Sequence, residues 1–123
     1  MQIMVNYSLY IGNVMEKSIA LINRFSGTSI SSESIDYIKY IYENLNTYFA
    51  EVLTEDQLTG LTSFVYSIGV DTFFEDSGIP EAILNGNFIL AKRLMRTYNK
   101  KGRVASASLT TRRNEEIKYF YGV

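Results

Sequence analysis

The sequence predicts an all-α fold, because several stretches carry complete helix signals and no convincing pair of strands accompanies them. The clearest stretch is residues 53–69, LTEDQLTGLTSFVYSIG. Thr54 and Gln57 form a capping box, apolar residues then recur at helical spacing, and Gly69 suits the left-handed residue that ends many helices. Apolar residues also cover an arc of roughly 160°, at about 100° per residue, along residues 35–52. Helices with such faces must pack on one another, which predicts one helical core.

The composition narrows both the fold and the chemistry. A chain of 123 residues with 46% hydrophobic residues and one proline fits a single domain and argues against disorder. No apolar run reaches the ~20 residues of a membrane span, and the N-terminus lacks a signal peptide's basic start and cleavage site, so we expect a soluble, cytoplasmic protein. The absence of cysteine and histidine excludes disulfides, zinc and haem sites and Ser-His-Asp catalysis. We therefore expect no cofactor and no bound metal.

Residues 1–12 are expected to form an N-terminal arm ahead of a single helical domain at residues 13–123. Apolar side chains occupy alternate positions of the arm, which favours an extended segment: Ile3, Val5, Tyr7, Leu9 and Ile11. An overlapping set fits a helical face instead: Ile3, Met4, Tyr7 and Ile11. Because no second strand follows, the arm is expected to pack on the domain or to pair with another chain, which leaves a homodimer open.

The domain is expected to contain six to seven short helices joined by tight turns. Their ranges are 13–25, 31–52, 53–69, 71–76, 80–84, 87–98 and 109–120. Ser31 is expected to cap the second helix, with Glu33 in its first turn, and Pro80 suits the first position of a helix. Residues 99–108 are expected to be a polar loop. The second helix has a wider apolar arc than a surface helix needs, so it is either central or leaves one flank for a partner.

Charge is distributed unevenly along the chain. Between residues 33 and 81 there are ten acidic residues and one basic residue, Lys39, whereas residues 92–118 contain nine basic residues and two acidic ones. These charges indicate either solvated helix faces that neutralise each other or a basic C-terminal surface for an anionic partner. Nucleic acid is the less favoured partner, because only Tyr98 supplies an aromatic side chain among the basic residues of 92–103.

Five motifs follow one another in a recognisable order. They are EKSIALINRFSG at 16–27, ISSESIDYI at 30–38, the stretch at 53–69, ILNGNFILAKRLMRTY at 83–98 and LTTRRNEEIKYF at 109–120. Their order and spacing resemble those of the phage-type lysozymes, the endolysin muramidases. Arg112, Arg113 and Glu116 match that family's Arg-Arg-x-x-Glu pattern. The resemblance therefore implies a lysozyme-like helical lobe.

The departures from the family concern its chemistry. Ser26 stands where the resemblance places the catalytic glutamate, and a serine cannot act as the general acid of glycoside hydrolysis. The family's β-rich lobe, with its second catalytic carboxylate, would follow Gly27, but only Thr28 and Ser29 precede the next motif at Ile30. Ser67 also replaces an asparagine of the family and Tyr98 a tryptophan. The resemblance thus implies an α-helical lobe without muramidase activity.

Two groups of charged residues could be interpreted as replacements for the missing catalytic carboxylates. Glu33 and Asp36 lie near Ser26 in sequence, but a place in the first turns of a helix favours capping and solubility over catalysis. Arg112 and Glu116, four residues apart, are interpreted as modest support on a helix surface. Neither group is expected to restore a catalytic site.

The resulting hypothesis is a non-catalytic protein of phage or prophage origin that binds, and thereby inhibits or regulates, a partner protein. Tyr37, Tyr40 and Tyr48 lie at the edge of the wide apolar arc, where a ring can be buried against a partner while its hydroxyl stays solvated. They are the expected contacts, unless the first helix and the arm cover the same flank. The alternative is a residual, two-chain or non-cleaving murein-binding lysozyme relative.

Overall fold

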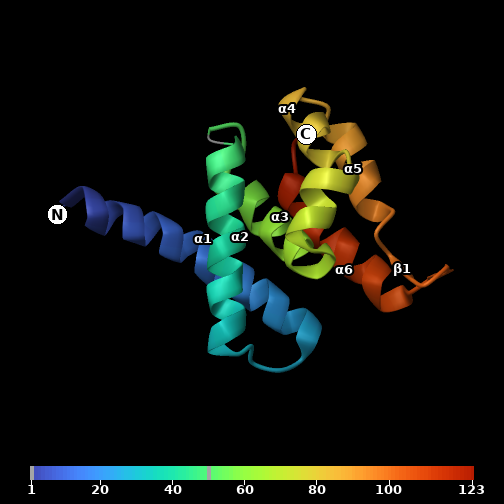
Figure 1. Cartoon of the computed structure of the whole chain (residues 1–123), viewed down its shortest axis with the longest axis horizontal. Helices are drawn as coiled ribbons and strands as arrows, with labels where there is room; N and C mark the ends of the chain where they lie inside the picture. Colours follow the sequence, from blue (N-terminus) through green and yellow to red (C-terminus); the bar gives the residue numbers. More distant parts are fainter. Residues whose placement is uncertain (1, 50) are drawn as a thin grey trace.

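The computed structural model describes residues 2–49 and 51–123, with side chains described from residue 13 onward. The predicted all-α class is confirmed (Figure 1). The elements are α1 (Gln2–Ser26), α2 (Ser32–Phe49), α3 (Glu55–Ile68), the π-helical turn η1 (Thr72–Asp76), α4 (Ile79–Leu84), α5 (Phe88–Arg96), β1 (Lys100–Lys101), β2 (Val104–Ala105), α6 (Ala107–Ile117) and the 3-10 turn η2 (Lys118–Phe120). Within the described residues, no helix is long and apolar enough to cross a membrane.

Helix α3 is the central element of the fold. It packs against α1, α2, α6 and η2, and Figure 1 shows it in the middle of the helices. Its residues from Gln57 to Val65 are all buried. The predicted capping box is confirmed: the Gln57 amide donates to Thr54 Oγ1 at 3.1 Å, and the Thr54 amide donates to Gln57 Oε1 at 2.9 Å. Gly69 ends the helix with φ +97° and ψ 149°, so it has the positive φ that favours glycine but not the left-handed helical conformation we predicted.

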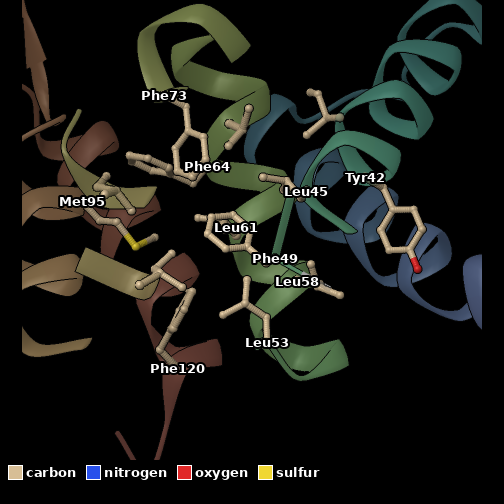
Figure 2. Close-up of a cluster of buried hydrophobic side chains, with 14 of the residues drawn as sticks. Tyr42, Leu45, Phe49, Leu53, Leu58, Leu61, Phe64, Phe73, Met95 and Phe120 are labelled. Atoms are coloured by element: carbon tan, nitrogen blue, oxygen red, sulfur yellow. The ribbon is translucent and has the colours of Figure 1, made fainter. Parts of the chain in front are cut away.

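Aromatic rings from three elements meet beside α3. The ring of Phe73 in η1 lies 6.3 Å from that of Phe49 in α2 and 6.4 Å from that of Phe64 in α3, all three fully buried (Figure 2). Their edge-to-face geometries are the ones that aromatic pairs favour. The adjacent Phe74 is only partly buried and turns toward Tyr48, at 4.9 Å between rings. The π-helical turn therefore supplies one ring to the core and the next to the surface of α2.

The extended conformation favoured for residues 1–12 is wrong from Gln2 onward, and the helical alternative agrees with the structure. Residues Gln2 to Ser26 form one continuous helix rather than an extended arm followed by a helix, and the boundary predicted at residue 12 falls inside it. Extending an existing helix adds one hydrogen bond for each residue that is fixed, whereas a strand needs a partner edge. In Figure 1 the N-terminal part of α1 extends away from the other helices. Met1 and the side chains of residues 2–12, on which the predicted packing of the arm depends, lie outside the described part.

A small hairpin replaces most of the polar loop predicted at residues 99–108. β1 and β2 pair antiparallel, with Lys100 opposite Ala105 and Lys101 opposite Val104. Gly102 turns the chain with φ +65°, which glycine adopts without strain. Strands of two residues are too short to produce an alternating pattern, so periodicity could not indicate them.

Gly60 allows α3 and α6 to approach closely. A Cβ built on Gly60 would lie 2.5 Å from the carbonyl oxygen of Glu116 and 2.8 Å from Cβ of Tyr119. The first of these atoms belongs to the backbone, so it cannot move aside as the end of a flexible side chain can.

We expect Gly60→Ala to lower the free energy of unfolding by about 1–3 kcal/mol, as overpacking does in other cores. The sign is informative, because Gly→Ala in an ordinary helix interior stabilises by about 0.5–1 kcal/mol. Urea unfolding followed by circular dichroism measures the change. Ser67→Ala, at an exposed position near the end of α3, is the control and should be neutral or slightly stabilising. A stabilised Gly60→Ala variant would contradict the close contact.

Candidate functional site

Ser26, which the sequence resemblance places at the position of a catalytic glutamate, forms hydrogen bonds within its own loop. It is exposed at the end of α1, and its Oγ lies 2.8 Å from the carbonyl oxygen of Thr28 and 3.2 Å from that of Asn23. The hydroxyl thus donates within the turn that follows the helix. Both hydrogen-bond partners of the Ser26 hydroxyl are backbone carbonyl oxygens. The serine therefore caps a turn, and neither partner can act as a general base.

The connection from α1 to α2 is short and internally bonded. Gly27 reverses the chain with φ +73°, and the Ile30 amide donates to Asn23 Oδ1 at 3.1 Å. The Ser34 amide donates to Ser31 Oγ at 3.2 Å, which confirms the predicted cap of α2. Residues 27–31 are therefore a tight link, and no β-rich segment lies between these two helices.

Two glutamates near this end of the molecule, Glu115 and Glu116, differ in their pKa shifts and in their access to solvent. Glu115 lines a hollow with Arg24, Phe25 and Thr111, but the hydrogen bond from Lys118 lowers the pKa of Glu115, and Arg24 acts in the same direction. Burial raises the pKa of Glu116, but that side chain is fully buried. A glycosidase acid needs both a raised pKa and access to the substrate. Each of these two glutamates meets one of these requirements and fails the other.

Glu33 and Asp36 lie near the start of α2, as predicted from the sequence. Both are exposed on the first two turns of α2, and Glu33 is in the first turn, where a carboxylate is favoured by the helix dipole. This arrangement is consistent with their interpretation as capping and solubilising residues.

The prediction of surface support for Arg112 and Glu116 is wrong, because Glu116 lies in the core. Glu116 Oε2 accepts from Ser63 Oγ at 2.5 Å and from Arg112 Nε at 3.1 Å. Arg113 Nε lies 2.9 Å from Glu116 Oε1, and both of these side chains are almost completely buried. Ser63 of α3 was not identified from the sequence, since nothing in the local pattern marks its contact with a residue 53 positions away.

Aromatic rings complete this buried cluster of Ser63, Arg112, Arg113 and Glu116. The guanidinium of Arg112 lies 4.8 Å from the ring centre of Phe25, and that of Arg113 lies 5.0 Å from the ring centre of Phe64. Arg112 Nη2 also donates to the carbonyl oxygen of Ser63 at 3.1 Å. The cluster ties α6 to α1 and α3, so the Arg-Arg-x-x-Glu motif has a structural role.

The three predicted contact tyrosines all lie on the outer face of α2. Their exposed fractions are 38% for Tyr37, 53% for Tyr40 and 46% for Tyr48. Tyr37 stacks on Tyr40 with ring centres 6.3 Å apart, while Tyr48 contacts Phe74 at 4.9 Å. The described part of α1 therefore leaves this flank open.

Two hollows meet at Tyr40 on this face. The larger, of about 430 Å³, is lined by Tyr40, Glu43, Asn44, Thr47, Tyr48 and Phe74. The smaller, of about 370 Å³, is lined by Tyr37, Tyr40, Gly69, Val70, Asp71 and Thr72. We call the two hollows together the α2 groove. Helical spacing from Tyr40 could have indicated Glu43, Asn44 and Thr47 in advance. Asp71 and Phe74 belong to the segment that follows α3, so only the structure shows that they line the groove.

The predicted basic surface is divided in the structure. Arg112 and Arg113 are drawn into the buried cluster, whereas Lys100, Lys101 and Arg103 are exposed on the hairpin. Tyr98 is not stacked on these cations but packs edge-on against Phe64 at 5.6 Å, and burial raises the pKa of Tyr98. Binding of nucleic acid by this region stays the less favoured alternative.

Comparison with known proteins identifies the scaffold. The family model described as phage lysozyme matches residues 14–116, which include Ser26, all of α2 and α3, and the buried cluster. Neither the search of curated proteins nor the search of solved structures gave a match. Since the family model covers most of the chain, this all-α protein belongs to the phage lysozyme family.

Proposed function

We propose that this phage lysozyme relative is a non-catalytic binding protein of phage or prophage origin, which acts by binding and inhibiting or regulating a partner protein. The proposal rests on Ser26, which the sequence resemblance places at the position of the catalytic glutamate and whose hydroxyl is hydrogen-bonded within its own turn. The α2 groove supports the binding role, because it is an exposed aromatic surface that the described helices leave uncovered.

The chemistry of glycoside hydrolysis supports the loss of activity. Most muramidases use two carboxylates on opposite sides of the scissile bond, and removal of a general acid alone slows the reaction by about 10²–10⁴. Ser26 has no acidic proton to give at neutral pH, and the five-residue link 27–31 leaves no room for a second wall of a sugar cleft. Glu115 and Glu116 do not replace the acid, for the reasons of pKa and access given above.

The surface of α2 supports binding to another protein. Tyrosines concentrate binding energy at interfaces because they bury a large rigid ring while keeping a hydroxyl that can be hydrogen-bonded. Exposed apolar surface that is contiguous and rimmed by polar residues is typical of interaction sites. Tyr37, Tyr40 and Tyr48, with Phe74 beside them, form such a surface.

The binding role is tested by capture from host lysate with the tagged protein, followed by identification of what is retained. The double variant Tyr37→Ser/Tyr48→Ser should keep the helical circular dichroism spectrum and retain clearly less partner. Tyr121→Ser is the matched control, because Tyr121 is also exposed but lies at the C-terminus, away from the groove. Undiminished capture by the double variant would show that this surface is not the binding site.

The loss of activity is tested by restoring the acid. We expect Ser26→Glu, like the unaltered protein, to leave the turbidity of permeabilised bacterial cells unchanged, because one carboxylate without a second and without the opposite wall of the cleft cannot complete the reaction. An intact phage-type endolysin is the positive control. Lysis by the unaltered protein at a rate comparable to that control would contradict a non-catalytic protein. Lysis by Ser26→Glu alone would contradict only the loss of the second carboxylate and of the cleft wall.

A non-cleaving or two-chain murein-binding protein is the alternative. Membership of the lysozyme family favours it, and the amide and hydroxyl groups of Asn44 and Thr47 beside the aromatic rings could bond to sugar. Sedimentation with purified murein separates the two: the alternative predicts that the protein pellets with murein and that Phe74→Ala weakens this, whereas the leading proposal predicts that it stays in solution.

A further inference from the structure

We infer that the α2 groove recognises a basic segment of the partner protein and holds two neighbouring cationic side chains, preferably arginines, one in each of the two hollows that Tyr40 lines. The inference rests on the proposed binding function and specifies the chemistry of its partner.

Each hollow of the groove combines a carboxylate with aromatic walls. Glu43 lines the larger hollow beside Tyr40 and Tyr48, and Asp71 lines the smaller one beside Tyr37 and Tyr40. Both carboxylates are exposed, and neither is in an ion pair within the described part of the chain. The groove therefore presents two carboxylate acceptors that are not ion-paired with any basic side chain in the described part of the chain.

An arginine side chain fits this combination better than other side chains. Its planar guanidinium can stack on a tyrosine ring and at the same time donate two parallel hydrogen bonds to a carboxylate. A lysine can supply the charge but not the bidentate geometry. Because Tyr40 lines both hollows, two such cations would be held close together, one in each hollow.

The wider charge distribution favours the same partner. The groove lies in the part of the chain, residues 33–81, that has ten acidic residues and one basic residue. Glu33 and Asp36 are exposed on the turns of α2 just before Tyr37 and Tyr40. The basic residue, Lys39, is exposed but lines neither hollow. Such a field attracts a basic segment and repels nucleic acid, so an anionic partner does not suit this face.

The test uses a fluorescently labelled Arg-Gly-Arg-Gly-Arg peptide, with the full-length protein titrated in at low ionic strength and binding followed by anisotropy. We expect Glu43→Gln/Asp71→Asn to weaken binding about tenfold, since each charge-assisted contact is lost while the groove keeps its shape. The matched control is Glu75→Gln/Glu81→Gln, which removes the same net charge from exposed positions outside the groove and should change binding less than about twofold. Equal weakening by both double variants would mean non-specific attraction and overturn the inference, as would no weakening by either.

Failure of this inference is distinguishable from failure of the proposed function. If Tyr37→Ser/Tyr48→Ser abolishes capture from lysate but Glu43→Gln/Asp71→Asn captures normally, the binding function holds and the basic partner is wrong. If neither double variant affects capture, the α2 groove is not the binding site and the inference is wrong, whereas the proposed function itself fails if the unaltered protein captures no partner. A second copy of the chain could also occupy the groove, through the exposed basic side chains of its hairpin, Lys100, Lys101 and Arg103. Sedimentation of the protein alone tests for this self-association. If the protein self-associates and Glu43→Gln/Asp71→Asn abolishes this self-association, the groove binds a second copy of the chain, and the inference of a separate partner protein is wrong.

Discussion

We expect Glu116→Gln to lower the free energy of unfolding by about 3–5 kcal/mol, the usual cost of breaking a buried ion pair by removing one partner. The substitution keeps the shape of the side chain but removes its charge. Arg113 then stays fully buried on the ring of Phe64 with no carboxylate to compensate it, and Arg112 loses its partner at 3.1 Å. Because small domains are stable by only about 5–15 kcal/mol, a loss of this size is readily measured by urea unfolding.

The neighbouring glutamate provides the control for this prediction. Glu115 pairs with Arg24 at 3.2 Å and with Lys118 at 2.9 Å, but these pairs lie at the surface. We expect Glu115→Gln to cost no more than about 1 kcal/mol. Similar losses for the two variants would contradict the burial of Glu116.

A compensating variant separates the charge from the packing. Replacing both partners, Arg113→Met with Glu116→Leu, removes the uncompensated charge and should restore most of the stability lost in Glu116→Gln, because apolar residues of similar volume often replace buried ion pairs at little cost. If the double variant is as unstable as Glu116→Gln, the loss comes from the shape of the site and not from its charge. If Glu116→Gln alone does not fold, the test still applies, because a folded Arg113→Met/Glu116→Leu variant would show that the uncompensated charge causes the loss.

Local signals made much of this fold predictable from sequence. The cap of α3 depends on Thr54 and Gln57, three residues apart, and the cap of α2 depends on Ser31 and Ser34. Such contacts are formed within one turn, so the sequence contains the whole interaction. The position of Tyr37, Tyr40 and Tyr48 at the edge of the apolar arc followed in the same way from helical spacing, but their exposure, which the first helix could have removed, required the structure.

Contacts between distant segments were not predictable in this way. Arg112 and Glu116 have the same spacing whether their helix face is solvated or buried, and the contact that decides between these is with Ser63 of α3. The groove likewise depends on Asp71 and Phe74, which reach α2 only because η1 folds back against it. The conformation of residues 2–12 depended on continuity with the helix that follows rather than on their own alternating pattern.

We expect Phe73→Ala to lower the free energy of unfolding by about 3–5 kcal/mol, comparable to the loss in Glu116→Gln. Phe73 is fully buried and contacts Phe49 and Phe64, so its truncation removes apolar burial and leaves a cavity where α2, α3 and η1 meet (Figure 2). Urea unfolding again measures the change. Protein that remains folded should still capture the partner, because the side chains that line the α2 groove are intact.

The adjacent residue should show the opposite pattern, which makes the pair a test of scaffold against site. Phe74 is partly exposed and forms a wall of the groove beside Tyr48, at 4.9 Å between rings. Phe74→Ala should cost less stability than Phe73→Ala, since less of its surface is buried, but should reduce capture of the partner. If Phe74→Ala costs as much stability as Phe73→Ala and capture stays normal, Phe74 is a core residue and not part of the binding surface. A preserved lysozyme scaffold that has acquired a binding surface requires the two effects to separate at these neighbouring positions.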